Sequence, residues 1–506
     1  MSMPLEMNGI ELARHSALEN TTYSADITII DWNEPDDPQD PFNWPLWKKW
    51  WATGLSLLES FVCSMNGTIL SVAHQDISEE FHISDAKFPH FYWLTTSWGL
   101  GAALCPLAIF PIMEDFGVRP MLLGTYFVFA CLLVPVGFAH NYATLTVVRF
   151  ISGGCVPLMS DAVASIASNV FHGDQARSIP ISLYVTVYLA STSIGLVVGA
   201  SILQSLPWRW IGYMETIWTA ALLPMLALGL LESRGSAILH KAKSLRSDGK
   251  NAYTAAELEL DGTPWYKLVI NSMKRPFYML LSELVVFFAA LWAAFILGTI
   301  YLFTQSIEQV YAELYGWHAV KAGYVQSTIV IGEILSCYNS AAWNVEIPGV
   351  PIPEARLYSS IIGGFVGVTG GMLVYGWASC PSINWMAPTF GLAMVGFRTT
   401  AVIIANANYL IDAYSKYAAS ALGAVGLVEN VAIAFLPLAT RDMYANLGFH
   451  WASSVLAFVS LALAATPLVM LRWGAVIRSR SLFMREAIID RRRGAVDTAS
   501  ICDGCL

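Results

Sequence analysis

Long apolar segments recur along this chain, and each is close to the ~20 residues that an α-helix needs to cross a lipid bilayer. Twelve can be delimited, at about 50–73, 89–113, 119–139, 143–170, 178–204, 208–231, 276–304, 319–338, 356–377, 384–406, 416–439 and 450–472. A polar stretch, residues 232–275, separates the sixth segment from the seventh. The sequence therefore predicts an all-α membrane protein with twelve transmembrane helices in two six-helix halves.

The scarcity of charged residues supports this prediction. Only 13% of the 506 residues are charged, whereas an ordinary soluble domain carries about 25%. The net charge of −9 also disfavours a nucleic-acid partner, because such a partner calls for a basic face. An ordinary soluble enzyme, a disordered chain and a nucleic-acid-binding protein are excluded.

Cysteine and histidine give no sign of a metal or cofactor site. Four of the eight cysteines lie deep in apolar segments, where cysteine behaves as a small hydrophobic residue. Cys502 and Cys505 form a CxxC pair in the polar tail without a second pair of ligands, and their modification stays open. The nine histidines are scattered without metal-ligand spacing. We therefore expect no cofactor and no metal.

The distribution of lysine and arginine predicts the orientation in the membrane. Of the 28 basic residues, 22 fall in the two tails and in the loops on the same side as the tails. Four fall on the opposite side, and Arg149 and Arg398 lie inside spans. We expect a cytosolic N-terminal tail (1–49), a first bundle (50–231), a cytosolic central loop (232–275), a second bundle (276–472) and a cytosolic C-terminal tail (473–506). The first 47 residues lack the apolar core of a signal peptide.

Short motifs follow one another in a fixed order along the chain. They are Asp37-Pro38, Asn43-Trp44 and Lys48-Lys49-Trp50 before the first span, and Tyr409-Leu-Ile-Asp412-Ala-Tyr414, Ala418-Ala-Ser-Ala421 and Phe435-Leu-Pro437 after or within the later ones. With this order and spacing, the chain resembles the major facilitator superfamily, specifically the fungal twelve-span drug:proton antiporters, which include multidrug, polyamine and secondary-metabolite transporters. The likeness runs from about residue 31 to residue 483. It implies the major facilitator fold, with a substrate site between the two halves near the middle of the membrane.

The loop between the second and third spans matches most of the superfamily's gating motif. Glu114, Gly117 and Arg119 agree with it, while Phe110 and Val118 replace its leading glycine and first arginine. A tight turn with opposite charges can satisfy the exposed backbone groups at neighbouring helix ends. The resemblance implies a gate at this turn, with a weaker latch because one arginine is missing.

Two further motifs lie within spans. Arg149 opens an Arg-Phe-x-x-Gly pattern in the fourth span, and the resemblance implies a role for it in proton coupling. A charged arginine within a span costs ~2.5–3.5 kcal/mol, so it should face a partner or water. Gly195 and Gly199 form a GxxxG in the fifth span, which lets helices approach closely. Leu196 stands where the antiporter pattern has proline, which leaves the direction of transport open.

Carboxylates in the spans are candidates for carrying protons, because a carboxylate in a low-dielectric site takes up a proton readily. They are Glu59, Asp161, Glu215, Glu283, Glu333 and Glu429. We expect water to solvate Glu215 and Glu283, which lie close to predicted span ends. Glu59, Asp161 and Glu429 are retained as proton-coupling candidates together with Arg149 and Arg398. Arg398 and Glu429 are hypothesised to compensate one another or to face the cavity, where the arginine would favour an anionic substrate.

Aromatic and amide side chains of the spans are candidates for contacting the substrate, since apolar pockets with a few polar groups suit amphipathic ligands. The candidates are Asn66, Tyr184, Tyr188, Trp292, Tyr301, Gln305 and Gln326. We expect a monomeric, proton-coupled exporter of a small organic compound such as a drug, toxin or secondary metabolite, and no enzyme. The plasma membrane is expected, with the vacuolar membrane as the alternative. Uptake of polyamines, organic acids or other nutrients, and a non-transporting membrane sensor, stay open.

Overall fold

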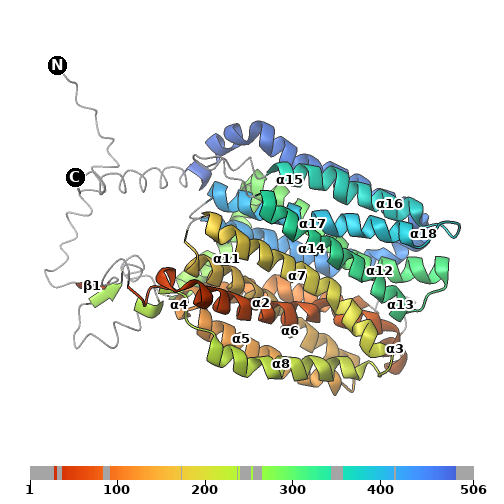
Figure 1. The fold of residues 1–506 in the computed structure, drawn as a ribbon, viewed down its shortest axis with the longest axis horizontal. Helices are drawn as coiled ribbons and strands as arrows, with labels where there is room; N and C mark the ends of the chain where they lie inside the picture. Colours follow the sequence, from red (N-terminus) through yellow and green to blue (C-terminus); the bar gives the residue numbers. More distant parts are fainter. Residues whose placement is uncertain are drawn as a thin grey trace.

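The computed structural model describes residues 28–30, 37–83, 92–172, 174–235, 237–239, 252–254, 265–343, 357–414, 417–481 and 483–485. Long helices run side by side along the length of the molecule (Figure 1). The first part of the chain forms η1 (Pro41–Asn43), α2 (Leu46–Ile69), η2 (Leu70–Ala73), α3 (His74–Glu80), α4 (Trp93–Phe116), α5 (Val118–Gly137), α6 (Tyr142–Val170), α7 (Asp174–Leu203) and α8 (Arg209–Gly229).

The second part contains the remaining helices. They are α11 (Trp265–Ser282), α12 (Leu284–Tyr315), α13 (Ala319–Gly323), η4 (Tyr324–Gln326), α14 (Ser327–Trp343), α15 (Leu357–Ile362), the π-helical η6 (Gly363–Thr369), α16 (Gly370–Ala378), α17 (Met386–Tyr414) and α18 (Ala418–Arg480). Two short strands, β1 (Thr28–Ile30) and β2 (Ala252–Thr254), pair in parallel, which the sequence did not indicate. In Figure 1, β1 lies at one end of the bundle and α3 and α13 lie at the other, which we call the β1 end and the α3 end.

Nine helical stretches of the described chain are long and apolar enough to cross a membrane. One of them, in α18, passes through Gly448, whose φ of 75° interrupts the helix, so α18 accommodates two predicted spans. Two other predicted spans correspond to α4, whose apolar part is Trp93–Ile109, and to α14, which has 17 residues. The described helices are consistent with the predicted count of twelve spans but do not by themselves confirm it.

The seventh predicted span, 276–304, differs from the helix in the structure. The backbone is extended at Glu283, where α11 has ended, and α12 then continues to Tyr315. Gln305 and Glu308 lie in this continuation, and other helices cover both: 3% of Gln305 is exposed, and 16% of the Glu308 side chain. A hydropathy profile places the end of the span where polar residues begin, because it contains no information on whether neighbouring helices shield those residues from water.

Glycines allow several helices to approach closely. At Gly195 a Cβ would lie 2.7 Å from the Met65 carbonyl oxygen, and at Gly199 it would collide with the Ile69 carbonyl, so both glycines lie where α7 crosses α2. At Gly99 a Cβ would lie 2.9 Å from backbone atoms of Ala434, where α4 of the first half meets α18 of the second. The two halves also meet where α7 packs against α14.

Candidate functional site

A buried arginine lies at the centre of the first half. Arg149 of α6 is 1% exposed. Its guanidinium donates to both oxygens of Asn66 on α2, with 2.9 Å to Oδ1, and to the Gly67 carbonyl at 3.0 Å. Its Nε has no partner among the described residues. The predicted cost of placing this charge within a span is therefore offset by three acceptors on one neighbouring helix.

Asn66 connects this arginine to a buried carboxylate. Its Nδ2 donates to Glu215 Oε1 of α8 at 2.9 Å, and its Oδ1 also accepts from Trp98 Nε1 of α4 at 3.0 Å. Glu215 is 1% exposed, so the expectation that water solvates it at a span end is wrong. Arg149 and Glu215 interact electrostatically through the amide between them. Glu283, the other carboxylate expected at a span end, is also buried and accepts from the Tyr414 hydroxyl at 3.1 Å.

The second half contributes one side chain to this site. Tyr301 of α12 stacks on Trp98 with ring centroids 6.1 Å apart. Its hydroxyl packs so closely on Gly67 that a Cβ there would lie 2.8 Å from it. That hydroxyl is buried and has no hydrogen-bond partner within the described part of the chain. Asn66, Trp98, Arg149, Glu215 and Tyr301 are called the Arg149 cluster below; it joins five helices and both halves.

Glu59 lies on α2 two turns before the Arg149 cluster and is fully buried. Cys63 Sγ lies 3.9 Å from Glu59 Oε1, and Oε2 has no partner in the described residues. A buried carboxyl with so few donors is unfavourable when ionised, which makes it chemically suited to hold a proton.

Asp161 and Glu429 come from opposite halves and interact with each other. Asp161 of α6 is exposed, and the Tyr184 hydroxyl of α7 donates to its Oδ1 at 3.1 Å. Glu429 of α18 is partly buried and interacts electrostatically with Asp161 and with Tyr188, whose ring lies 6.4 Å from that of Tyr184. These four side chains form an acidic, aromatic surface between the halves.

Arg398 does not join that surface. Its guanidinium lies 4.5 Å over the Phe397 ring, and its aliphatic part packs on Gly367 of η6. Within the described ranges the structure contains no ion pair between Arg398 and Glu429. The hypothesis that these two charges compensate one another therefore has no contact to support it.

The remaining cavity candidates, Trp292, Gln305 and Gln326, are all buried. Trp292 is buried against Phe295, with stacked rings 6.5 Å apart. Gln305 is buried without partners for either amide atom among the residues described. Gln326 is buried at the α3 end, where it lines a small pocket between the halves with Leu196, Thr304 and Glu308.

Comparison with known proteins decides the family. The family model described as Major Facilitator Superfamily matches residues 56–437. The chain belongs to this superfamily. It is 30% identical to the MFS transporter cpaT of Aspergillus oryzae, over 90% of this chain and 92% of that protein. It is 28% identical to the ascochitine biosynthesis cluster MFS transporter of Didymella fabae (90% of each chain), and 26% identical to the efflux pump radE of Floropilus chiversii (93% and 88%).

A solved structure of the superfamily shares the fold. The proton:xylose symporter XylE aligns with a TM-score of 0.62 at 13% identity, over 85% of this chain and 96% of that one. The protein is therefore a multi-pass membrane transporter with the major facilitator fold, as the sequence predicted.

The turn at which the sequence predicts a gating motif is capped by a residue that the sequence did not single out. Gly117 has φ 90° at the turn between α4 and α5, and Arg119 donates to the Ala227 carbonyl at 2.9 Å. Glu232, three residues after the end of α8, accepts from the backbone N–H groups of Val118 and Arg119 at 3.3 and 3.0 Å. The Glu114 side chain lies outside the described residues. Glu232 was identifiable only as the first acidic residue after the sixth span.

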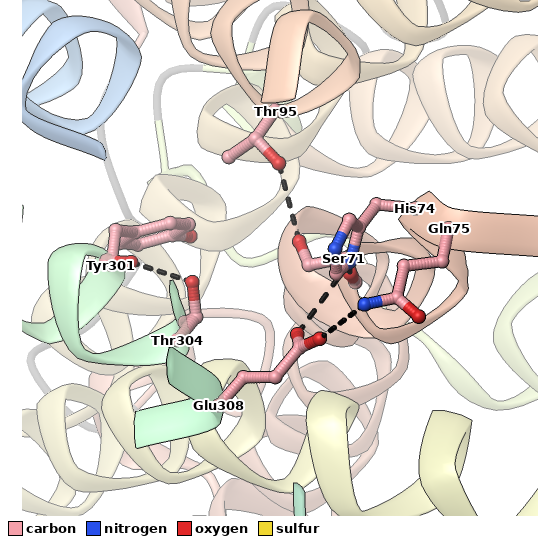
Figure 2. A network of polar contacts seen from close by, with 7 residues as sticks. All are labelled: Ser71, His74, Gln75, Thr95, Tyr301, Thr304 and Glu308. Carbon is pink, nitrogen blue, oxygen red and sulfur yellow. Dashed lines mark hydrogen bonds and ion pairs between the residues drawn. The ribbon is translucent and has the colours of Figure 1, made fainter. Parts of the chain in front are cut away.

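A polar latch joins the two halves of this transporter at the α3 end (Figure 2). Glu308 of α12 accepts from Gln75 Nε2 at 3.2 Å and lies 3.6 Å from His74 Nδ1, both on α3. Close by, Ser71 and Thr95 hydroxyls are 3.2 Å apart. We call His74, Gln75 and Glu308 the α3-end latch. Since it holds the halves together here, the α3 end is closed in this conformation, and sequence reasoning missed all three residues.

Proposed function

We propose that this protein is a proton-coupled exporter of a small organic compound, with fungal secondary metabolites as the expected class of cargo. The relatives support this class: one is named for a biosynthesis cluster and another as an efflux pump. The single observation that carries proton coupling is the Arg149 cluster. It contains an arginine and a carboxylate that are both buried and are linked by one amide.

Glu215 is the proton acceptor in this proposal. When Glu215 is ionised, its charge balances that of Arg149 across Asn66, and the cluster is electrically neutral. When Glu215 takes up a proton, Arg149 is left without a counter-charge in a buried site, which is unfavourable. The cluster then relaxes by moving helices or admitting water. Because Tyr301 packs on Gly67 and Trp98, that relaxation is transmitted to the second half.

The substrate would bind on the surface formed by Asp161, Tyr184, Tyr188 and Glu429. Asp161 is exposed although it lies in the middle of α6, so this surface is reached from between the helices. Asp161 belongs to the first half and Glu429 to the second. Rocking of one half against the other would therefore change the distance between these two carboxylates. Two carboxylates beside two phenol rings favour a cationic or polar aromatic ligand over the anionic one that Arg398 suggested.

The predictions on orientation, membrane and oligomeric state are kept in this proposal, whereas Asp161 and Glu429 are reassigned from proton coupling to substrate binding. The β1 end would face the cytosol, as the distribution of basic residues indicates. With the α3 end closed, the conformation described here would then be inward-facing. The protein would act as a monomer in the plasma membrane, without enzymatic activity, and Glu59 would be an accessory proton carrier.

The test begins with the cargo. Metabolites in the medium of cells with and without the gene are compared without preselection, and compounds missing from the knockout medium are candidates. A protonophore is then added to wild-type cells. Export predicts that the identified compound rises inside the cells when the proton gradient is lost, whereas uptake by symport predicts that it falls. An unchanged cellular content would refute proton coupling.

A further inference from the structure

A second buried carboxyl lies in the seam between the halves, away from the Arg149 cluster. Glu333 of α14 is 0% exposed, and neither of its oxygens has a hydrogen-bond partner among the described residues. It lies on the face of α14 turned away from Ile331, Ile334 and Leu335, each of which is more than half exposed. Glu333 therefore faces the protein interior.

Among the described residues, the neighbours of Glu333 provide no positive charge. Ser193 of α7 is the side chain that interacts with it across the seam, without hydrogen-bond geometry, and the Ser193 hydroxyl is itself buried and unpartnered in the described chain. On α17, the other helix packed against α14, Arg398 is engaged with Phe397 and Gly367 and has no interaction with Glu333. An ionised carboxylate here would be buried without compensation, which is strongly unfavourable.

A small pocket with polar lining lies at the closed end of the molecule, about two helical turns from this carboxyl. Gln326 and Glu308 line the small pocket beneath the α3-end latch, and the Gln326 Nε2 is also unpartnered among the described residues. Gln326 and Glu333 are separated by seven residues of continuous helical backbone, which corresponds to about 10 Å. Separation of α7 and α14 at the α3 end would therefore bring water from this pocket to within about two helical turns of Glu333.

We propose that Glu333 is a second proton-binding site, and that a proton on this carboxyl is required for α7 and α14 to close against each other. The proton enters when the α3 end is open and the carboxyl is hydrated. Closure then buries a neutral acid beside Ser193. Loss of that proton leaves a bare charge in the seam and favours separation of the halves. This proposal rests on the proposed function only for the source of its proton, the gradient across the membrane.

The first experiment measures the proton on Glu333 directly. The purified full-length protein in lipid is treated with dicyclohexylcarbodiimide, which reacts with protonated carboxyls in apolar surroundings, and adducts are quantified by peptide mass spectrometry. We expect an adduct at Glu333 that decreases as the pH rises and is absent from E333Q. Glu313, an exposed carboxylate on α12, is the internal control and should react several-fold less. Labelling of Glu333 no greater than that of Glu313 would overturn the proposal.

Infrared spectroscopy detects the proton on Glu333 without a reagent that must reach the buried carboxyl. A protonated acid gives a carbonyl band, and the pH-difference spectrum of the wild type should contain one band that E333Q lacks and S193A shifts. The absence of any such difference would count against the proposal in the same way.

The coupling to closure is tested with a buried cysteine. Ala322 lies at the seam and is 0% exposed. In A322C, the alkylation rate of the introduced cysteine relative to its rate in the unfolded protein should rise several-fold with pH, and adding E333Q should abolish this rise. Equal pH dependence with and without E333Q would refute the coupling. These measurements use neither substrate nor gradient, so their failure would leave the proposed function standing. A gradient-independent export would refute that function but not the protonation of Glu333.

Discussion

Replacing Arg149 by alanine removes the cation of the Arg149 cluster and leaves Glu215 buried without a counter-charge. The change deletes three hydrogen bonds from a charged donor, to two oxygens of Asn66 and one of Gly67. Removing one partner of a buried charge pair costs ~3–5 kcal/mol. Glu215 keeps its bond from Asn66 Nδ2, and the pair is not in direct contact. We therefore expect about 3 kcal/mol of destabilisation, the lower end of that range.

A double variant separates the charge imbalance from lost packing. In R149A/E215Q the site is neutral, and the introduced glutamine can still accept from Asn66, so we expect recovery of at least about 1 kcal/mol, within the range for coupled neighbours. The matched control is R398A. Arg398 is half-buried and has no ion pair within the described residues, so its loss should cost less than about 1 kcal/mol.

The assay is equilibrium unfolding of each full-length variant in mixed micelles, followed by tryptophan fluorescence at several denaturant concentrations. The free energies of unfolding of the wild type, R149A, E215Q and the double variant form one thermodynamic cycle. The reasoning is refuted if R149A is no less stable than R398A. It is equally contradicted by a double variant that is no more stable than R149A.

Three further predictions follow from packing and from the helix ends. G199A should destabilise the protein by about 1–3 kcal/mol, because its Cβ collides with the α2 backbone, whereas G426A, which has open space, should cost almost nothing; unfolding midpoints compare the two. E308Q removes the charge of the α3-end latch and should increase the alkylation rate of A322C up to about five-fold, corresponding to ~1 kcal/mol. E232A should lower stability by about 0.5–2 kcal/mol through the loss of a helix cap, and an unfolding midpoint equal to that of the wild type would contradict this.

The fold and the central arginine could be predicted from the sequence because both depend on local signals. Apolar segments of membrane length give the helices, and an arginine within such a segment must find acceptors, as Arg149 does on α2. Its carboxylate partner could not be predicted in the same way. Glu215 lies 66 residues further along the chain, two turns inside its span, and only the packing of α8 on α2 brings it to Asn66.

Contacts between helices account for the other differences. Arg398 and Glu429 looked like partners because they are the unusual charges of consecutive spans, yet the rotation of α17 places Arg398 against Gly367. Glu308 lies beyond the predicted end of the seventh span, yet α3 covers it and supplies its partners. Hydropathy and spacing contain no information about which face of one helix meets which face of another. The packing of the two halves determines which side chains meet in the site, whereas the sequence shows only which side chains each helix carries.

The most direct test of proton coupling by the Arg149 cluster is transport by E215Q in proteoliposomes, with the cargo identified by metabolite comparison. Wild-type protein should accumulate that compound against its gradient when a pH gradient is imposed, at up to about ten-fold per pH unit for each coupled proton. E215Q should still exchange the compound across the membrane at equal pH but should lose this accumulation. If E215Q accumulates the compound as strongly as the wild type does, Glu215 carries no coupled proton and the account is wrong.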